Sequence, residues 1–222
     1  FGSRIVKVSP GKNQTLGMAG VMSTVRPLTI SDAEAMRTLR YVTYVVPIVI
    51  GTGHIEHNER ARDTDIFGVG SDASAAWNMA VAQGSFLPPD DPENARPFAV
   101  LGSKVRRELF GDENPLGQFI RVSGTRFRVV GVMESKGDFL GTDLDEIVYI
   151  PAARSLQLFN RPNLQEMDIT FSEEGTSEGV AAEIKQRIRD LHGDDDVTVF
   201  TQDDMLGSLD RILGMLTMAI SA

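Results

Sequence analysis

The sequence predicts an α+β fold, mainly because a β-α-β pattern occurs near each end of the chain. The first pattern is a strand, a helix and a strand over residues 4–9, 30–40 and 41–50. The second is a strand, a helix and a strand over residues 167–171, 180–191 and 197–200. Two such units pair naturally into a split βαβ, or ferredoxin-like, sheet with its helices on one side. The chain between them is β-rich.

This order of elements predicts two subdomains. Residues 1–51 and 161–222 together are expected to form the ferredoxin-like subdomain from both chain ends. Residues 52–160 are expected to form an inserted β-rich subdomain, since two extended runs, an Ala- and Pro-rich stretch and a hairpin follow one another there.

Local signals support the elements of the first unit. Thr29 and Asp32 have the spacing of a capping box, which would open the first helix. Residues 12–27 contain glycine and proline with little periodicity, so we expect a mobile loop. Pro47 lacks a backbone N–H, and the strand that contains it should therefore lie at a sheet edge or carry a bulge.

The hairpin is the most informative stretch, LFGDENPLGQFIRVSGTRFRVVGV over residues 109–132. Gly111 can close a short helix over residues 105–110. Two β-rich runs, 119–122 and 127–132, are joined by residues 123–125 as a hairpin connection. These residues include no nucleophile, general base or metal cage, so the stretch indicates a scaffold.

Two helical stripes follow in the second half of the chain. The helix over 180–191 places Val180, Ile184, Ile188 and Leu191 on one face. A last helix, capped by Asp203 or Asp204, would carry an apolar stripe. Its members recur at intervals of three and four: Leu206, Leu209, Leu213, Leu216 and Ile220. It is either a core-facing helix or a stalk that continues into a membrane span and pairs with its copy in a dimer.

Composition excludes several classes of function. The 222 residues carry a net charge of −9, which argues against binding nucleic acid or anionic lipid headgroups. There is no cysteine, so neither disulfides nor thiolate metal sites are expected. No run approaches the roughly 18–20 apolar residues of a membrane span. The chain starts with Phe1 and stops inside an apolar pattern, so we expect a domain cut from a longer polypeptide.

Motifs that resemble catalytic or binding sites have simpler explanations. Gly68, Gly70 and Ala73 fit a dinucleotide pattern, but a turn between a strand and a helix accounts for them. The run from Gly175 to Gly179 fits G-x-S-x-G, yet Ser177 or Thr176 is better explained as a helix N-cap.

The remaining polar clusters and the tryptophan are also given structural roles. His54 and His57 would point to opposite faces of a strand as exposed residues. Residues 194–196, three aspartates, read as a solvated turn because no calcium-loop spacing surrounds them. Trp77, the only tryptophan, is assigned to the core, with a contact surface as the alternative. We therefore predict no catalytic, cofactor or metal site.

The hairpin and its neighbours resemble the extracytoplasmic core domain of MacB-type, FtsX-like ABC-transporter permeases. Other resemblances are FGSRIVKVSPG over residues 1–11, Leu28-Thr29 with Asp32-Ala33, the "V..V.P" strand over 42–47 and the "D..v.iP" run over 145–151. The resemblance covers nearly the whole chain. It implies a porter-like subdomain from both chain ends and an inserted Sabre-like subdomain.

The resemblance also implies a function. The domain would be non-enzymatic and would lie on the extracytoplasmic face of the bacterial inner membrane, in the periplasm if the cell is Gram-negative. It would convert movement of flanking transmembrane helices, driven by a separate ATPase domain or subunit, into opening and closing outside the membrane. A permease dimer and, in one branch, a periplasmic adaptor protein are implied partners. Residues 12–27 and 88–97 depart from the efflux members, so no adaptor-contact residue is carried over.

Two alternatives remain open at this point. One is a small enzyme, either a hydrolase through Ser177 or a nucleotide-dependent enzyme through Gly68 and Gly70. The other is a periplasmic ligand-binding domain that holds a small molecule between its two subdomains.

Overall fold

The computed structural model describes residues 4–11, 26–139, 142–204 and 207. The strands are β1 (Ile5–Pro10), β2 (Val42–His57), β3 (Arg60–Val69), β4 (Val81–Gly84), β5 (Phe98–Leu101), β6 (Phe119–Val122), β7 (Thr125–Met133), β8 (Asp138–Phe139), β9 (Thr142–Asp143), β10 (Val148–Pro151), β11 (Glu166–Phe171) and β12 (Val197–Phe200). The helices are α1 (Ile30–Met36), α2 (Ala73–Ala76), α3 (Ser103–Phe110), α4 (Ala152–Leu158), α5 (Ser177–His192) and the 3₁₀ turn η1 (Leu144–Glu146). The predicted α+β class is confirmed.

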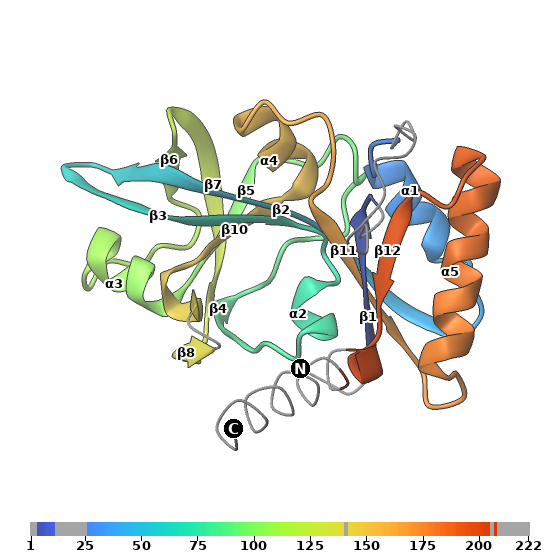
Figure 1. The fold of residues 1–222 in the computed structure, drawn as a ribbon. Helices are drawn as coiled ribbons and strands as arrows, with labels where there is room; N and C mark the ends of the chain where they lie inside the picture. The colour runs from blue at the N-terminus through green and yellow to red at the C-terminus, as the bar shows by residue number, and fades with distance from the viewer. Residues whose placement is uncertain (1–3, 12–25, 140–141, 205–206, 208–222) are drawn as a thin grey trace, which may run out of the picture.

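The two chain ends build one antiparallel sheet in the order β12-β1-β11-β2. Helix α1 connects β1 to β2, and α5 connects β11 to β12 (Figure 1). Both helices contribute to one core with these strands, for example through Met36 of α1, Ile184 of α5 and Ile169 of β11. This is the order in which two β-α-β units interleave.

Two details of the helices differ from the predictions. Helix α1 ends at Met36 rather than residue 40, because the chain turns back and Tyr41 takes a positive φ of 66°. The capping box that opens α1 is confirmed: Asp32 N–H donates to Thr29 Oγ1, and Thr29 N–H donates to Asp32. On α5, Leu191 is 42% exposed and His192 is buried instead.

The prediction for Pro47 is wrong. Its strand, β2, lies between β11 and β3, and Pro47 is in register with Met167 without a bulge. The ladder with β3 starts one residue later, at the pair Ile48↔Val69. The missing N–H is tolerated because no β3 residue is paired with Pro47.

Beyond Gly51 the strand β2 enters a closed barrel. Each strand pairs with the next in the ring β2-β3-β10-β5-β7-β6, and β6 pairs with β2 again. The interior is apolar and includes Ile55, Phe127 and Ile150, with Phe110 of α3 packed into the same core. The predicted division into two subdomains stays a prediction, since β2 takes part in both sheet and barrel.

The hairpin forms as predicted, with a tighter turn. Val122 pairs with Thr125, so only Ser123 and Gly124 lie between the strands. Their φ angles are 46° and 84°. A two-residue hairpin turn with two positive φ angles matches the right-handed twist of the strands.

A third cluster covers the outer face of the sheet and includes Val46, Trp77, Phe86 and Tyr149. Helix α2 spans only Ala73–Ala76, after which the chain continues into β4. Trp77 is 7% exposed, which confirms its assignment to the core.

The last apolar stripe lies outside the described residues; its members are Leu206, Leu209, Leu213, Leu216 and Ile220. Most of the predicted loop over residues 12–27 also lies outside them. The cap of the final helical turn is Thr201 rather than Asp203 or Asp204. Asp204 N–H donates to Thr201 Oγ1, and Asp204 in turn accepts from Thr201 N–H. Within the described part of the chain, no helix is long and apolar enough to cross a membrane.

Candidate functional site

The region where the sheet meets the barrel is the candidate functional site, and we call it the junction. Its centre is Arg37, just after α1. Arg37 forms ion pairs with Glu34 at 2.9 Å and with Asp72, and its Nη2 donates to the Val45 carbonyl at 3.3 Å. Asp72 also accepts from Val45 N–H at 3.4 Å. One arginine and one aspartate therefore tie α1, β2 and the start of α2 together.

Charge and burial favour this arrangement. Burial alone would lower the pKa of Arg37, but hydrogen bonds to Asp72 and Glu34 outweigh it and raise that pKa. A guanidinium is charged at any physiological pH. Arg37 therefore stays charged, and available for its ion pairs at the junction, over the physiological pH range.

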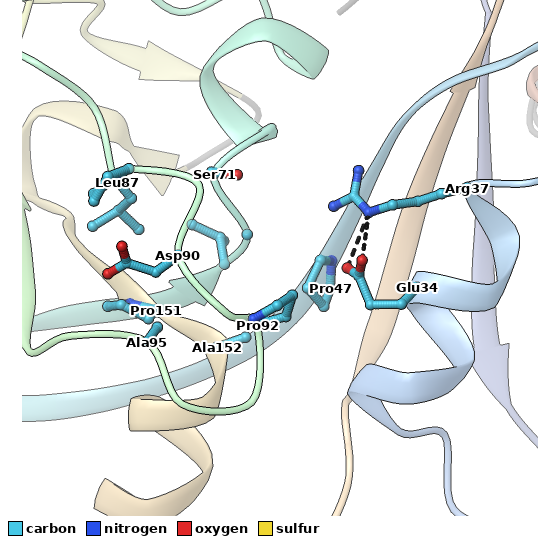
Figure 2. A pocket seen from close by; sticks show the side chains of 13 residues that line it. Glu34, Arg37, Pro47, Ser71, Leu87, Asp90, Pro92, Ala95, Pro151 and Ala152 are labelled. Atoms are coloured by element: carbon cyan, nitrogen blue, oxygen red, sulfur yellow. Dashed lines mark hydrogen bonds and ion pairs between the residues drawn. The ribbon is translucent and has the colours of Figure 1, made fainter.

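A small hollow opens at the junction, with Glu34 and Arg37 on one side and Pro92, Ala95 and Pro151 on the other (Figure 2). Its volume is about 40 Å³, whereas drug-sized ligands occupy pockets of roughly 300–1,000 Å³. Its prolines have fixed φ angles; they are Pro47, Pro88, Pro92 and Pro151. The hollow suits a stiff joint better than a ligand site.

Close packing also joins β2 and β3 to helix α4, which follows the hollow-lining Pro151. A Cβ added to Gly68 of β3 would lie 2.1 Å from Ser155 Cβ of α4. Ser155 is fully buried, and its hydroxyl donates to the Val49 carbonyl of β2 at 3.4 Å. Gly68 is therefore required for the contact between helix and strand.

The same observation bears on the dinucleotide pattern at Gly68, Gly70 and Ala73. A pyrophosphate site needs a parallel βαβ unit and a helix N-terminus. Here β3 leads into a helix of four residues, and the next strand, β4, pairs antiparallel with β7 and not with β3. The parallel neighbour of β3 is β10, which comes much later in the chain. The glycines serve packing, since a Cβ on Gly70 would also come within 3.0 Å of Pro47.

The hydrolase pattern does not assemble either. Thr176 is the N-cap of α5 and accepts from Gly179 N–H at 3.1 Å, while Ser177 is the first helical residue. His192 ends the same helix, about 22 Å away at 1.5 Å per residue. Its Nδ1 pairs with Asp196 at 2.9 Å and its Nε2 with Asp32 at 3.2 Å.

The His192 cluster is structural. Burial would lower the pKa of His192, but the hydrogen bonds to Asp196 and Asp32 prevail and raise it. Asp196 is 4% exposed and also accepts from Arg26 N–H at 2.8 Å. The expectation of a solvated turn is therefore wrong for Asp196, which anchors the chain, although Asp194 is exposed.

The two histidines of β2 face opposite ways, as predicted, but only one is exposed. His54 pairs with Asp63 at 2.7 Å on the surface. His57 is 9% exposed, its ring lies 4.0 Å from that of Phe110, and its Nδ1–H donates to the Phe119 carbonyl. The prediction that His57 is exposed is wrong because α3 covers it. No cluster of three potential metal ligands occurs in the described part of the chain.

Sequence reasoning missed the polar residues that tie the elements together: Arg37, Asp72 and Asp168. Trp77 Nε1–H donates to Asp168 at 2.9 Å, and Asp168 is 2% exposed. Asp168 could have been noticed, since it is the one acid in the predicted strand over residues 167–171, MDITF. Nothing local distinguishes Arg37 or Asp72 from ordinary surface charges.

Comparisons with known proteins agree on the family. The model of the MacB-like periplasmic core domain matches residues 2–187. The macrolide export ATP-binding/permease protein MacB of Marinobacter nauticus is 26% identical over 219 residues, which is 98% of this chain and 34% of the relative. The pyoverdine export ATP-binding/permease protein PvdT of Pseudomonas aeruginosa is 32% identical over 165 residues, 73% of this chain and 24% of the relative. The chain thus spans about a third or less of these relatives.

Solved structures show the same fold. The periplasmic region of MacB from Actinobacillus actinomycetemcomitans superposes with a TM-score of 0.76 at 21% identity, covering 94% of each chain. The extracellular domain of the ABC-type transporter YknZ from Gram-positive bacteria gives a TM-score of 0.70 at 17% identity, covering 88% of this chain and 99% of that one. The combination of sheet and barrel is therefore a shared architecture.

Proposed function

Since the chain belongs to the family of MacB-like periplasmic core domains, we propose that it transmits ATP-driven movement of a permease to the space outside the membrane. The family and the relatives' names identify it as the extracytoplasmic domain of an ABC-transporter permease. ATP would be hydrolysed by a separate cytoplasmic ATPase domain or subunit. The domain itself would carry no reaction.

The junction is the observation that carries this proposal. A body that transmits movement must not dissipate it by internal bending, so its parts need several independent connections. Here β2 runs from the sheet into the barrel, Arg37 and Asp72 link α1 to α2, and Gly68 packs against α4. These connections support a single stiff unit.

The proposed partners follow from the same role. We propose a homodimeric or heterodimeric permease at the extracytoplasmic face of the bacterial inner membrane, with a periplasmic adaptor in Gram-negative cells. Flanking transmembrane helices would anchor the domain. The apolar stripe with Leu209, Leu213 and Leu216 would be a stalk or a dimer contact. Export of small toxic compounds or peptides, or extraction of lipoproteins, is compatible with this role.

The test uses the full-length transporter. Replacing Leu209, Leu213 and Leu216 by serine should leave ATP binding intact and abolish the ATP-dependent change in distance between the two copies of the domain. The matched control is Leu191→Ser, since Leu191 is an exposed leucine on α5, and it should change neither quantity. Movement that persists in the triple variant would refute the stalk.

The enzyme alternative is tested on the same chain. We expect no hydrolase or nucleotide-binding activity, and Ser177→Ala should change nothing that is measured. Turnover that disappears in Ser177→Ala would overturn the proposal.

A further inference from the structure

The outward face of the β6–β7 hairpin carries three arginines and an exposed phenylalanine, and we call these four residues the arginine face. They are Phe119 and Arg121 on β6 and Arg126 and Arg128 on β7. All four are exposed, Phe119 by 42%, because the alternate residues of both strands point into the barrel core. The hairpin lies at the end of the molecule opposite α5 (Figure 1).

Strand pairing arranges the arginine face in two rows. Arg121 lies opposite Arg126, and Phe119 lies opposite Arg128. Opposite residues are about 5 Å apart, whereas the two rows are two residues, or about 6.8 Å, apart along a strand. The guanidinium carbon of Arg126 lies 3.6 Å from the centre of the Phe119 ring, and that of Arg128 lies 5.9 Å from it. Attraction to the ring therefore holds together two cations that repel each other.

The charge of the arginine face is not neutralised by the described part of the chain. None of its three arginines forms an ion pair with another described residue; Arg121 donates to the Gly124 carbonyl at 3.3 Å. Glu56 of β2 is in register with Arg121 but pairs with His54 at 3.5 Å. Residues 119–128 contain no acid, although the net charge of the chain is −9. A cluster of one sign attracts groups of the opposite sign.

A separate hollow of about 430 Å³ extends the arginine face toward the turn between β2 and β3. Phe119, Arg121 and Arg126 form part of its wall. Asn58 and Gln118 add side-chain amides, which can donate hydrogen bonds. Of the acids, Glu56 alone lines it. The hollow therefore gives a ligand on the arginine face room to place a side chain beside further donors.

Charge and spacing favour an extended acidic segment of a protein as the ligand. Guanidinium groups bind carboxylates through two parallel hydrogen bonds. Side chains two residues apart in an extended segment point the same way and are about 6.8 Å apart, which is the distance between the two rows. Arginine and phenylalanine are also enriched in protein interfaces. A nucleic-acid duplex or an anionic bilayer would bring many more negative charges against a chain that is itself acidic.

We propose that the arginine face binds a partner protein through an extended segment with acidic residues at alternate positions. One carboxylate would lie between Arg121 and Arg126. The next would pair with Arg128 while its methylene groups pack on the Phe119 ring. Side chains alone make this contact, since both edges of β6 and of β7 are already paired. The inference does not rest on the proposed transport role, because its evidence lies in this hairpin.

The test uses a six-residue peptide of alternating glutamate and threonine, with blocked ends and a fluorescent dye. The full chain is titrated into it while fluorescence anisotropy is recorded. We expect saturable binding, and the same peptide with glutamine in place of glutamate should bind at least about tenfold more weakly. Arg126→Gln and Arg128→Gln should each weaken the glutamate peptide several-fold. Raising the salt concentration from about 0.05 M to about 0.3 M should also weaken it, because exposed charges are screened.

The matched control is Arg189→Gln, which removes the same charge from an exposed arginine on α5. It should leave both peptide affinities unchanged. Equal binding of the two peptides, or a loss in Arg189→Gln as large as in Arg126→Gln, would overturn the proposal.

Sedimentation with phosphatidylglycerol vesicles tests a lipid surface as the ligand, and we expect no binding. Vesicle binding that Arg126→Gln abolishes, without binding of the glutamate peptide, would overturn the proposal in favour of a membrane. Neither assay contains ATP or the transporter, so their failure leaves the transport proposal untouched.

Discussion

A double-mutant cycle at Gly68 and Ser155 tests how the barrel is held against α4. In Gly68→Ala, the new methyl carbon would sit 2.1 Å from Ser155 Cβ, about 1.3 Å short of ordinary contact at 3.4 Å. Overpacking of this kind costs about 1–3 kcal/mol. Ser155→Gly removes that Cβ and its hydrogen bond, at about 1–2 kcal/mol from helix propensity and the lost bond.

The double variant should be less destabilised than the two single costs combined, because the alanine methyl then fills the space that the serine leaves. We expect a coupling energy of about 1 kcal/mol or more, as for residues in direct contact. Urea unfolding of all four proteins measures it. Gly70→Ala is the matched control, since its Cβ meets Pro47 at 3.0 Å and not Ser155; it should cost less and combine additively with Ser155→Gly. Additivity at Gly68 within about 0.5 kcal/mol would refute the packing role.

Three further predictions concern caps and one buried charge. Folding raises the pKa of His192. The contribution of His192 to the free energy of unfolding is therefore complete below the unfolded pKa of about 6.5 and is lost as pH rises through the folded pKa. The difference in unfolding free energy between wild type and His192→Gln should shrink from about pH 6 to about pH 8.5 in urea titrations, and a constant difference would contradict this. Thr29→Ala should cost about 1 kcal/mol, seen as a fall of about 2–4 °C in Tm, whereas exposed Ser31→Ala should not; equal effects would remove the capping box from the explanation. Thr176→Ala should destabilise by a similar amount and Ser177→Ala by much less, and the reverse order in unfolding experiments would show that the cap is misassigned.

Elements with local signals were predictable from the sequence. The capping box at Thr29 and the stripe of Val180, Ile184 and Ile188 depend on residues three or four apart, so periodicity locates them. The hairpin was predictable for the same reason. Its turn is one residue shorter than expected because Ser123 also takes a positive φ.

Features that depend on distant pairing were not predictable. The barrel closes where β2 pairs with β6, at Ile55↔Val122. These residues are far apart in the sequence, and no local pattern predicts their pairing. Pro47 could be placed only once the start of the β3 ladder was known. His57 is buried because Phe110 of α3 packs on it, and a run of polar residues gives no sign of that contact.

A domain that moves as one stiff unit keeps its internal distances constant, so we propose to measure a distance inside it. The chain has no cysteine, so Glu59→Cys on the barrel and Ala182→Cys on α5, both exposed, provide two spin-label sites. Transporters that carry one labelled copy are compared with and without ATP. We expect the same distance to within about 1–2 Å in both states, because a stiff body moves without internal rearrangement. A larger ATP-dependent shift between the two labels would contradict it.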